Sequence, residues 1–199
     1  MKRTELHRRL SLLNPRVNAQ ASLKARIAGG FYLLNFVTGS LALFFASHKL
    51  TGASNAYNLV ATVCYVVVTL LFYELFKPVN RSVAFIASCF SLVGCALSLP
   101  FPFIPHPVSN LVLFGVYCLM TGYLILRSYF LPGVLGILMM IGGLGWLTFL
   151  SPALVHRLTP YNMAPAIAAE GALTLWLLIA GVNAERWNDQ ARLSSLSRS

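Results

Sequence analysis

Six apolar runs, each close to the length that crosses a lipid bilayer as a helix, occupy most of this chain. A spanning helix needs roughly 20 apolar residues. The chain is 57% hydrophobic and only 10% charged, which is outside the range of water-soluble domains. Backbone groups in hydrocarbon must be paired within the segment, so each run is predicted to be helical. The runs are 27–47, 57–76, 82–99, 110–126, 133–150 and 163–182.

These runs predict an all-α integral membrane protein, folded as a compact six-transmembrane-helix bundle. Short breaks between the runs place sequential helices antiparallel. Rows of small residues on three runs allow close helix approach and are expected to face the interior. The rows comprise Ala84, Ser88, Ser91, Cys95 and Ser98; Gly136, Gly142, Gly143 and Gly145; and Ala164, Ala168, Gly171 and Ala172.

The sequence divides into three parts around the predicted bundle. Residues 1–24 form a basic segment, read either as an amphipathic interfacial helix carrying Leu6, Leu10 and Leu13 or as a disordered tail. Residues 25–187 form the six-helix transmembrane domain, and residues 188–199 form a Ser-rich, flexible C-terminal tail. A Pro-rich outer loop is expected between the third and fourth runs, at 99–108.

The distribution of Lys and Arg predicts the orientation. Alternate breaks, counting the two termini, hold thirteen of the 15 basic residues, and the other breaks hold only Lys49 and Arg157. Loops rich in Lys and Arg stay in the cytoplasm. We therefore expect both termini in the cytoplasm (N-in/C-in), in the cytoplasmic (inner) membrane. The net charge of +10 follows from this rule and does not indicate nucleic-acid binding.

Glu170 is the acidic residue placed well inside a run, among small residues. An ionised carboxylate there costs on the order of 3 kcal/mol, so it is expected to face the bundle or to be protonated. Polar residues at similar depth or on neighbouring turns are candidate partners. They are Asn35, Thr38, Tyr65, Tyr117 and Thr174. One hypothesis is a proton- or ligand-binding pocket open to the outer face; the other is a hydrogen-bonded knot that fixes helix register.

Other polar residues fit ordinary interfacial roles. Glu74 precedes Lys77 by three residues and Arg81 follows, which predicts an interfacial ion pair; Arg127 ends the fourth run at the same level. His48, His106 and His156 all map to the outer side, but none shows metal-ligand spacing, so they are weak metal candidates. No cofactor is expected, and no nucleophile–base pattern indicates catalysis.

Several segments resemble one bacterial multi-pass membrane family, catalogued as domain of unknown function 4386. They are ARIAG at 25–29, YELFKPVNR at 73–81, GYLILRSYFLPG at 122–133 and EGALTLWLLIAGVN at 170–183. The resemblance implies a six-helix inner-membrane protein and assigns no reaction. It emphasises Lys77, Pro78, Asn80, Arg127, Pro132, Glu170 and Asn183. The chain departs from the family in its longer basic N-terminus and its short first outer loop, 49–56.

Two functional hypotheses follow from these features. The first is a non-enzymatic membrane component or accessory subunit, which uses its small-residue faces to pack against a membrane partner or a second copy. The second is a carrier, proton-coupled or not, for a small solute, with Glu170, Tyr65 and Tyr117 as its polar pocket. In both, the lipid bilayer is the constant partner and nucleic acid is not expected.

Overall fold

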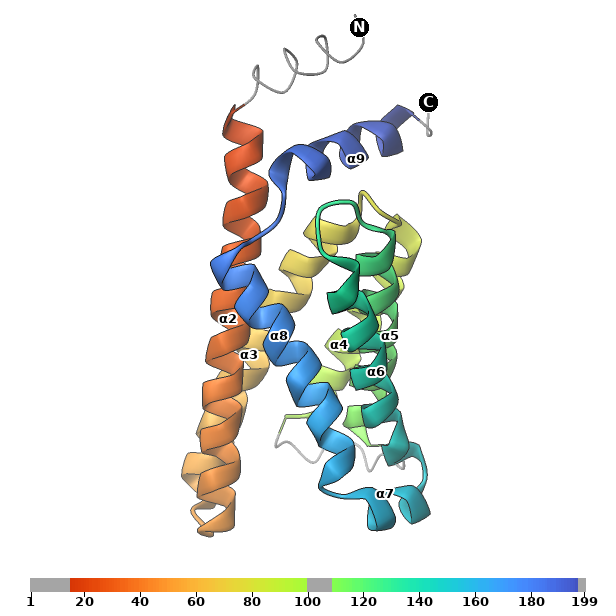
Figure 1. Cartoon of the computed structure of the whole chain (residues 1–199). Coiled ribbons are helices and arrows are strands. Elements are labelled where there is room, and N and C mark those ends of the chain that lie inside the picture. The colour runs from red at the N-terminus through yellow and green to blue at the C-terminus, as the bar shows by residue number, and fades with distance from the viewer. Residues whose placement is uncertain (1–14, 100–108, 197–199) are drawn as a thin grey trace, which may run out of the picture.

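The structure is a computed structural model that describes residues 15–99 and 109–196, and within these ranges it contains helices and no β-strand. The long helices are α2 (Pro15–Ser47), α3 (Thr51–Phe76), α4 (Arg81–Leu97), α5 (Asn110–Arg127), α6 (Gly133–Leu147) and α8 (Ala164–Ile179). The shorter elements are η1 (Thr148–Leu150), α7 (Pro152–Leu158), η2 (Tyr161–Met163) and α9 (Ala184–Leu196). Figure 1 shows α7 at one end of the bundle and α9 at the other.

The predicted apolar runs all fall on these helices. Five segments are long and apolar enough to cross a membrane, and Arg81–Leu97 is a shorter apolar helix. The five are Gln20–Ser47, Thr51–Phe76, Asn110–Arg127, Gly133–Leu150 and Tyr161–Ile179. The prediction of an all-helical protein with several helices of membrane-spanning length is therefore confirmed.

The outer surface of the bundle is apolar. Large hydrophobic side chains point away from the core on several helices: Leu43 is 74% exposed, Val134 61% and Ile179 77%. Single exposed apolar residues are ordinary on soluble proteins, but a surface covered with them is favourable only against lipid or another apolar surface. The surface therefore agrees with the hydropathy of the helices.

Two predicted boundaries at the start of the chain differ from the structure. Helix α2 begins at Pro15 and continues through residue 24, so the expected break between a basic segment and the first span is absent. Ala21 and Ala25, each at most 2% exposed, are buried along this extension, and that packing extends the helix beyond the apolar run. The leucines of the proposed interfacial helix, at positions 6, 10 and 13, lie outside the described residues.

The connection after α2 is shorter than predicted. Helix α3 begins at Thr51, so most of the expected outer loop at 49–56 is helical. Lys49 turns the chain with a φ of 59°, in the left-handed region, and Leu50 N–H donates to the carbonyl of Phe45. Within the segment predicted as a loop, Ser54 donates to the carbonyl of Ala42 on α2. The Pro-rich loop lies almost wholly outside the described residues.

The six long helices form a closed ring. Each packs against its neighbour in the chain, and α8 closes the ring by packing against α2 as well as α6. Figure 1 shows α8 crossing in front of the bundle between α2 on one side and α6 on the other. Because the ring contains an even number of helices, the described start of α2 and helix α9 lie at the same end.

Glycines on α6 bring two neighbours close on two different faces. A Cβ on Gly136 would lie 2.7 Å from the carbonyl oxygen of Gly122, and one on Gly143 would lie 2.8 Å from that of Gly115, both on α5. On the other face, a Cβ on Gly145 would lie 2.5 Å from the carbonyl oxygen of Asn162, beside α8. Small residues allow such close approach in membranes, and the interior position predicted for this row is confirmed.

The small residues of α4 and α8 differ in outcome. On α4, four of the five predicted residues are buried, and Ser98 is partly buried. On α8, however, Ala164 and Ala168 are exposed, and a Cβ on Gly171 would meet nothing within 4 Å. The prediction that this row faces the interior is therefore wrong for Ala164, Ala168 and Gly171, whereas Ala172 is partly buried and packs against the core. Ala166, Ala169 and Leu173 occupy the interior instead, because that side of α8 faces α6 and α2.

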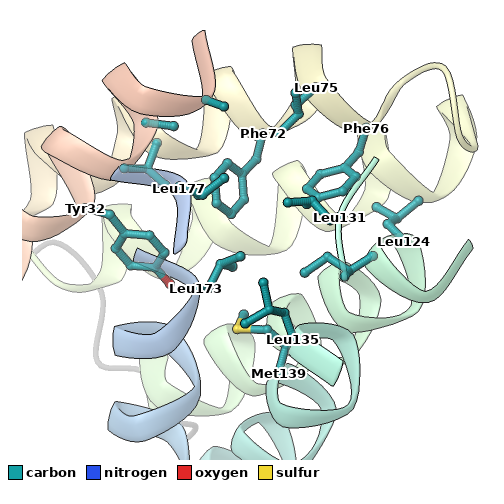
Figure 2. Packing of buried hydrophobic residues seen from close by; sticks show 14 of the residues in the cluster. Tyr32, Phe72, Leu75, Phe76, Leu124, Leu131, Leu135, Met139, Leu173 and Leu177 are labelled. Carbon is teal, nitrogen blue, oxygen red and sulfur yellow. The ribbon is translucent and has the colours of Figure 1, made fainter. Parts of the chain in front are cut away.

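The half of the bundle nearer α9 has a tightly filled core. Phe72 and Phe76 of α3 meet Leu131, Leu135 and neighbouring residues of α5, α6 and α8 there (Figure 2). Tyr32 lies at the edge of this cluster, close to Leu173 in the same view. We call this region the closed half.

The C-terminal segment is helical where a flexible tail was predicted. Helix α9 runs from Ala184 to Leu196 and lies across the end of the bundle (Figure 1). Two side chains fix it: Trp187 donates its indole N–H to the carbonyl of Leu75 (2.8 Å), and Gln190 accepts from the N–H of Tyr129 (3.2 Å) and donates to the carbonyl of Arg127 (3.2 Å). Serine content had suggested disorder, but these contacts to the ends of α3 and α5 order the segment. Residues 197–199 lie outside the described part of the chain.

Candidate functional site: a buried carboxyl beside a hollow between the helices

Glu170 of α8 is buried inside the ring, with 7% of its surface exposed. Its Oε2 accepts a hydrogen bond from the Tyr32 hydroxyl of α2 at 2.7 Å. Its Oε1 accepts from the indole N–H of Trp146 on α6 at 2.9 Å and from the Cys118 thiol of α5 at 3.7 Å. Three helices therefore aim neutral donors at one carboxyl, and the described ion pairs do not include it.

Two of the predicted partners, Tyr65 and Tyr117, pack near this carboxyl but do not form a hydrogen bond with it. The Tyr65 ring lies edge-on to that of Tyr32, with centroids 5.5 Å apart, and its centroid is 6.1 Å from that of Tyr117. The Tyr117 hydroxyl is buried and has no hydrogen-bond partner within the described ranges. The structure thus gathers the expected tyrosines around a third, Tyr32, which makes the bond to Glu170.

The remaining predicted partners take other positions. Thr174 donates to the backbone carbonyl of Glu170 and not to its carboxyl (2.7 Å). Thr38 donates to backbone carbonyls of its own helix, at Leu34 (2.8 Å) and Asn35 (3.3 Å). Such bonds to the preceding turn satisfy a hydroxyl locally. Asn35 does reach the site, as one of the residues that line the hollow beside Glu170.

A hollow of about 390 Å³ opens beside Glu170 in the half of the bundle nearer α7. It lies inside the ring and is lined by residues of all six long helices. Asn35, Tyr65 and Glu170 lie at its inner end, and residues near the α7 end of the helices lie at its outer end. Its volume is in the range of small-molecule sites. We call this region the open half.

The lining of the hollow is mainly apolar and aromatic, with polar groups at intervals. Among the described residues that line it, Glu170 alone carries a formal charge. The aromatic members are Phe36, Tyr65, Phe114 and Trp146; the polar members are Asn35, Ser40, Asn58, Thr62, Ser98 and Asn110. Asn58 and Asn110 bind Ser98 from two sides, at 2.8 Å and 2.6 Å, which closes the lining between α3, α4 and α5.

Sequence reasoning missed Tyr32, Trp146 and Cys118. Trp146 and Cys118 lie at the depth of Glu170 along their runs, whereas Tyr32 lies only five residues into the run at 27–47, nearer its opposite end. On this first run the partners predicted for Glu170 were Asn35 and Thr38. Trp146 was interpreted as a boundary anchor or packing residue, and Cys118 as a small apolar filler. For Trp146 and Cys118, the signal available in the sequence was a depth equal to that of Glu170; the sequence does not give the helix rotation that turns these side chains toward the carboxyl.

The charged residues near α9 form a separate cluster around Glu74. Lys77 lies 2.7 Å from Oε1 of Glu74, which is the ion pair that the spacing predicts, and Lys24 of α2 adds a contact at 3.4 Å to Oε2. These side chains are about two-fifths exposed. Arg81 begins α4 and Arg127 ends α5, both exposed at the same end of the bundle.

The histidines do not converge in the described part of the chain. His48 begins the connection after α2, where its Nδ1 lies 2.9 Å from the carbonyl oxygen of Phe44. His156 is exposed on α7, and His106 lies outside the described residues. Within 15–99 and 109–196, no three His, Cys, Asp or Glu residues are grouped as metal ligands would be.

The fold and the site together define a class: a multi-helix protein with an apolar exterior and a carboxyl buried within its helical ring. The family model described as Domain of unknown function (DUF4386) matches residues 108–181. This match confirms the resemblance over α5 to α8, which includes Arg127, Pro132 and Glu170. Residues 1–107 and the segment from residue 182 lie outside it. No curated protein and no solved structure matches the chain.

Proposed function

We propose that all six long helices cross the cytoplasmic membrane of a bacterium, with both termini in the cytoplasm. The charges at the two ends of the bundle support this orientation. Lys24, Lys77, Arg81, Arg127, Arg186 and Arg192 lie toward the α9 end, whereas Lys49 and Arg157 lie toward the α7 end. Helix α4, with 17 residues, extends about 25 Å and is accommodated within the ring by local thinning of the bilayer.

We infer that the open half binds a small amphipathic cation and that the protein is a carrier for such molecules. One observation supports this most directly: a lone carboxyl lines a hollow of about 390 Å³ and has no basic partner among the lining residues. A buried charge without a counter-ion is unfavourable, so either a proton or a cationic ligand compensates it. Exchange of one for the other is the basis of proton coupling.

The hydrogen bonds of Glu170 leave room for a ligand. A carboxylate oxygen accepts up to two hydrogen bonds. Oε1 receives its two from Trp146 and Cys118, whereas Oε2 receives one, from Tyr32. The cationic group of a ligand therefore fits beside Oε2. The aromatic rings of Phe36, Phe114 and other lining residues suit the apolar body of such a molecule, and cations bind favourably over such faces.

Transport in vesicles tests this proposal. The purified full-length chain is placed in vesicles that enclose a pH-sensitive dye, and benzyltrimethylammonium or ethidium is added outside. These probes carry a permanent charge, so they do not cross the bilayer as neutral amines. Cation-driven proton movement is expected with the native chain and is expected to be lost in Glu170→Gln, whose amide can still pair with Tyr32 and Trp146.

A matched variant keeps this experiment specific. Thr174→Val removes the neighbouring bond to the Glu170 backbone but leaves the carboxyl unchanged, so it is expected to transport normally. If Glu170→Gln transports as well as the native chain, Glu170 is not the coupling group. If neither probe moves protons or binds to the native chain, the carrier hypothesis is wrong for this cation class.

An accessory-subunit role is the second candidate, supported by the exposed small residues of α8. Ala164, Ala168 and Gly171 present a surface on which another helix can approach closely. Ala168→Leu is expected to abolish recovery of a stoichiometric membrane partner, or of a second copy, in mild detergent. Ala169→Leu is not a suitable control because Ala169 is buried; Leu175→Ala, on the exposed side of the same helix, is suitable.

A further inference from the structure

A second hollow, of about 400 Å³, lies near the α9 end of the bundle and belongs to neither the buried carboxyl nor its cavity. It is formed where the connection after α5 meets the connection after α8. The N–H of Asn183 donates to the carbonyl of Phe130 (3.1 Å) and ties the two connections together. Both lie at the end where α9 crosses the bundle (Figure 1).

The polar groups around this second hollow are hydrogen-bond donors without an acidic neighbour in its described lining. Arg186 is exposed, and its guanidinium donates from Nη1 to the carbonyl of Tyr129 at 3.4 Å. The described ion pairs do not include Arg186, although Asp189 lines the adjoining hollow. Tyr129 and Asn183 also line this hollow. A guanidinium with free donors suits phosphate oxygens.

The apolar side of the second hollow continues into the surface that faces lipid. Trp176, 40% exposed, and Pro132 line it, and the exposed side chains of Ile179 and Val134 lie on the same helix ends. Tryptophan is typical of the level of lipid headgroups, where one side is apolar and the other polar. The hollow thus joins a cationic group to a surface for acyl chains.

We propose that this second hollow binds the headgroup of an anionic phospholipid of the cytoplasmic leaflet. Arg186 contacts the phosphate, Asn183 and Tyr129 donate to headgroup oxygens, and the acyl chains lie along Trp176 and Ile179. The occupant is a lipid and not a free phosphate ester, because a cationic group and an exposed apolar surface adjoin each other at this hollow. Anionic lipids attract basic residues at the membrane surface.

Quenching of tryptophan fluorescence tests this proposal. The full-length chain in dodecylmaltoside micelles is titrated with phosphatidylglycerol or phosphatidylcholine brominated near the headgroup. Phosphatidylglycerol is expected to quench with an apparent affinity at least about tenfold higher, as a charged hydrogen bond provides. The saturable part of the quenching is expected to disappear in Trp176→Phe, which identifies the reporter.

Three arginine variants distinguish binding at the headgroup site from a general attraction between positive charge and anionic lipid. Arg186→Gln is expected to lose about tenfold in affinity for phosphatidylglycerol, whereas Arg192→Gln, the same charge change on the same helix, changes it less than about twofold. Arg186→Lys keeps the charge and is expected to recover most of the affinity. Equal losses in the two glutamine variants, or no preference for phosphatidylglycerol, would overturn the proposal.

A soluble competitor distinguishes the source of the phosphate. Glycerol 1-phosphate at millimolar concentration presents the same ester without acyl chains and is expected to leave the quenching unchanged. If it displaces the brominated lipid completely, the site recognises a free phosphate ester and the assignment to lipid is wrong. Neither result bears on transport by the open half, so the two proposals fail independently.

Discussion

The closed half and the open half of the bundle use the same six helices but are packed differently. In the closed half, Phe72, Phe76 and the leucines around them fill the space between helices (Figure 2). In the open half, the same helices carry Asn35, Gly39 and other small or polar residues around a hollow of about 390 Å³. A helical ring in lipid can therefore be held together at one end while the other end encloses a binding site.

The largest difference is expected between a glycine at a close helix contact in the closed half and a glycine that lines the hollow. A Cβ at Gly136 would lie 2.7 Å from the carbonyl oxygen of Gly122, a backbone atom that cannot move alone. Gly136→Ala is therefore expected to lower the free energy of unfolding by about 3 kcal/mol. Gly39→Ala, where nothing lies within 4 Å, is expected to raise it by up to about 1 kcal/mol through helix propensity. Unfolding by SDS in mixed micelles measures both.

The next largest difference in stability is expected when one phenylalanine in each half is replaced by alanine. Phe72 is 3% exposed in the filled core, so Phe72→Ala leaves a void and is expected to cost about 2 kcal/mol. This is less than in a water-soluble core because lipid also solvates the ring. Phe114→Ala enlarges a hollow that is already present and loses the ring contact with Tyr65, so it is expected to cost about 1 kcal/mol. Equal costs in the same SDS titration would show that the two halves are packed alike.

Two buried tyrosines at the boundary of the halves differ by one hydrogen bond. Tyr32→Phe removes the donor to Oε2 of Glu170 and is expected to destabilise the chain by about 1.5 kcal/mol. Tyr117→Phe removes a buried hydroxyl without a described partner, so it is expected to be neutral or slightly stabilising. Thermal unfolding in detergent measures the difference. A larger loss in Tyr117→Phe would contradict the arrangement around Glu170.

The smallest effect is expected at Glu74, whose surroundings differ from those of Glu170. Glu74 is partly exposed and paired with Lys24 and Lys77, whereas Glu170 is buried among neutral donors. Glu74→Gln is expected to cost about 0.5 kcal/mol, and the difference is expected to vanish in 1 M salt, where the screening length is about 3 Å. Unfolding at two salt concentrations tests this. A salt-independent loss would mean that Glu74 has a role beyond its ion pairs.

The helices and their lengths could be predicted because lipid forces long apolar segments to be helical. Hydropathy marks the depth of each residue along its run, and this was enough to group Tyr65, Tyr117 and Glu170. It does not give the rotation of each helix or the order of helices in the ring. For that reason Ala164 and Ala168 were placed inside although α8 turns them outward. Tyr32 on α2 was missed because its depth along the predicted run differs from that of Glu170.

Segments that are held in place by a few contacts also could not be predicted from the sequence. The C-terminal segment is polar and rich in serine, which favours a tail, yet Trp187 and Gln190 bind the ends of α3 and α5 and order it as α9. The extension of α2 to Pro15 depends similarly on alanines that pack against neighbouring helices. Amino-acid composition indicates whether a segment prefers water or lipid. It does not indicate that a single tryptophan or amide side chain will hold the segment against the bundle.

Accessibility of two engineered thiols tests most directly whether the open half is a water-filled site reached from outside the cell. Gly39 lines the hollow and Gly171 lies on α8 outside it, and a Cβ meets nothing within 4 Å at either position. With the four native cysteines replaced by alanine, an impermeant thiosulfonate reagent added to intact cells is expected to label Gly39→Cys and to leave Gly171→Cys unlabelled. Labelling of Gly39→Cys only from the cytoplasmic side, or from neither side, would contradict the account.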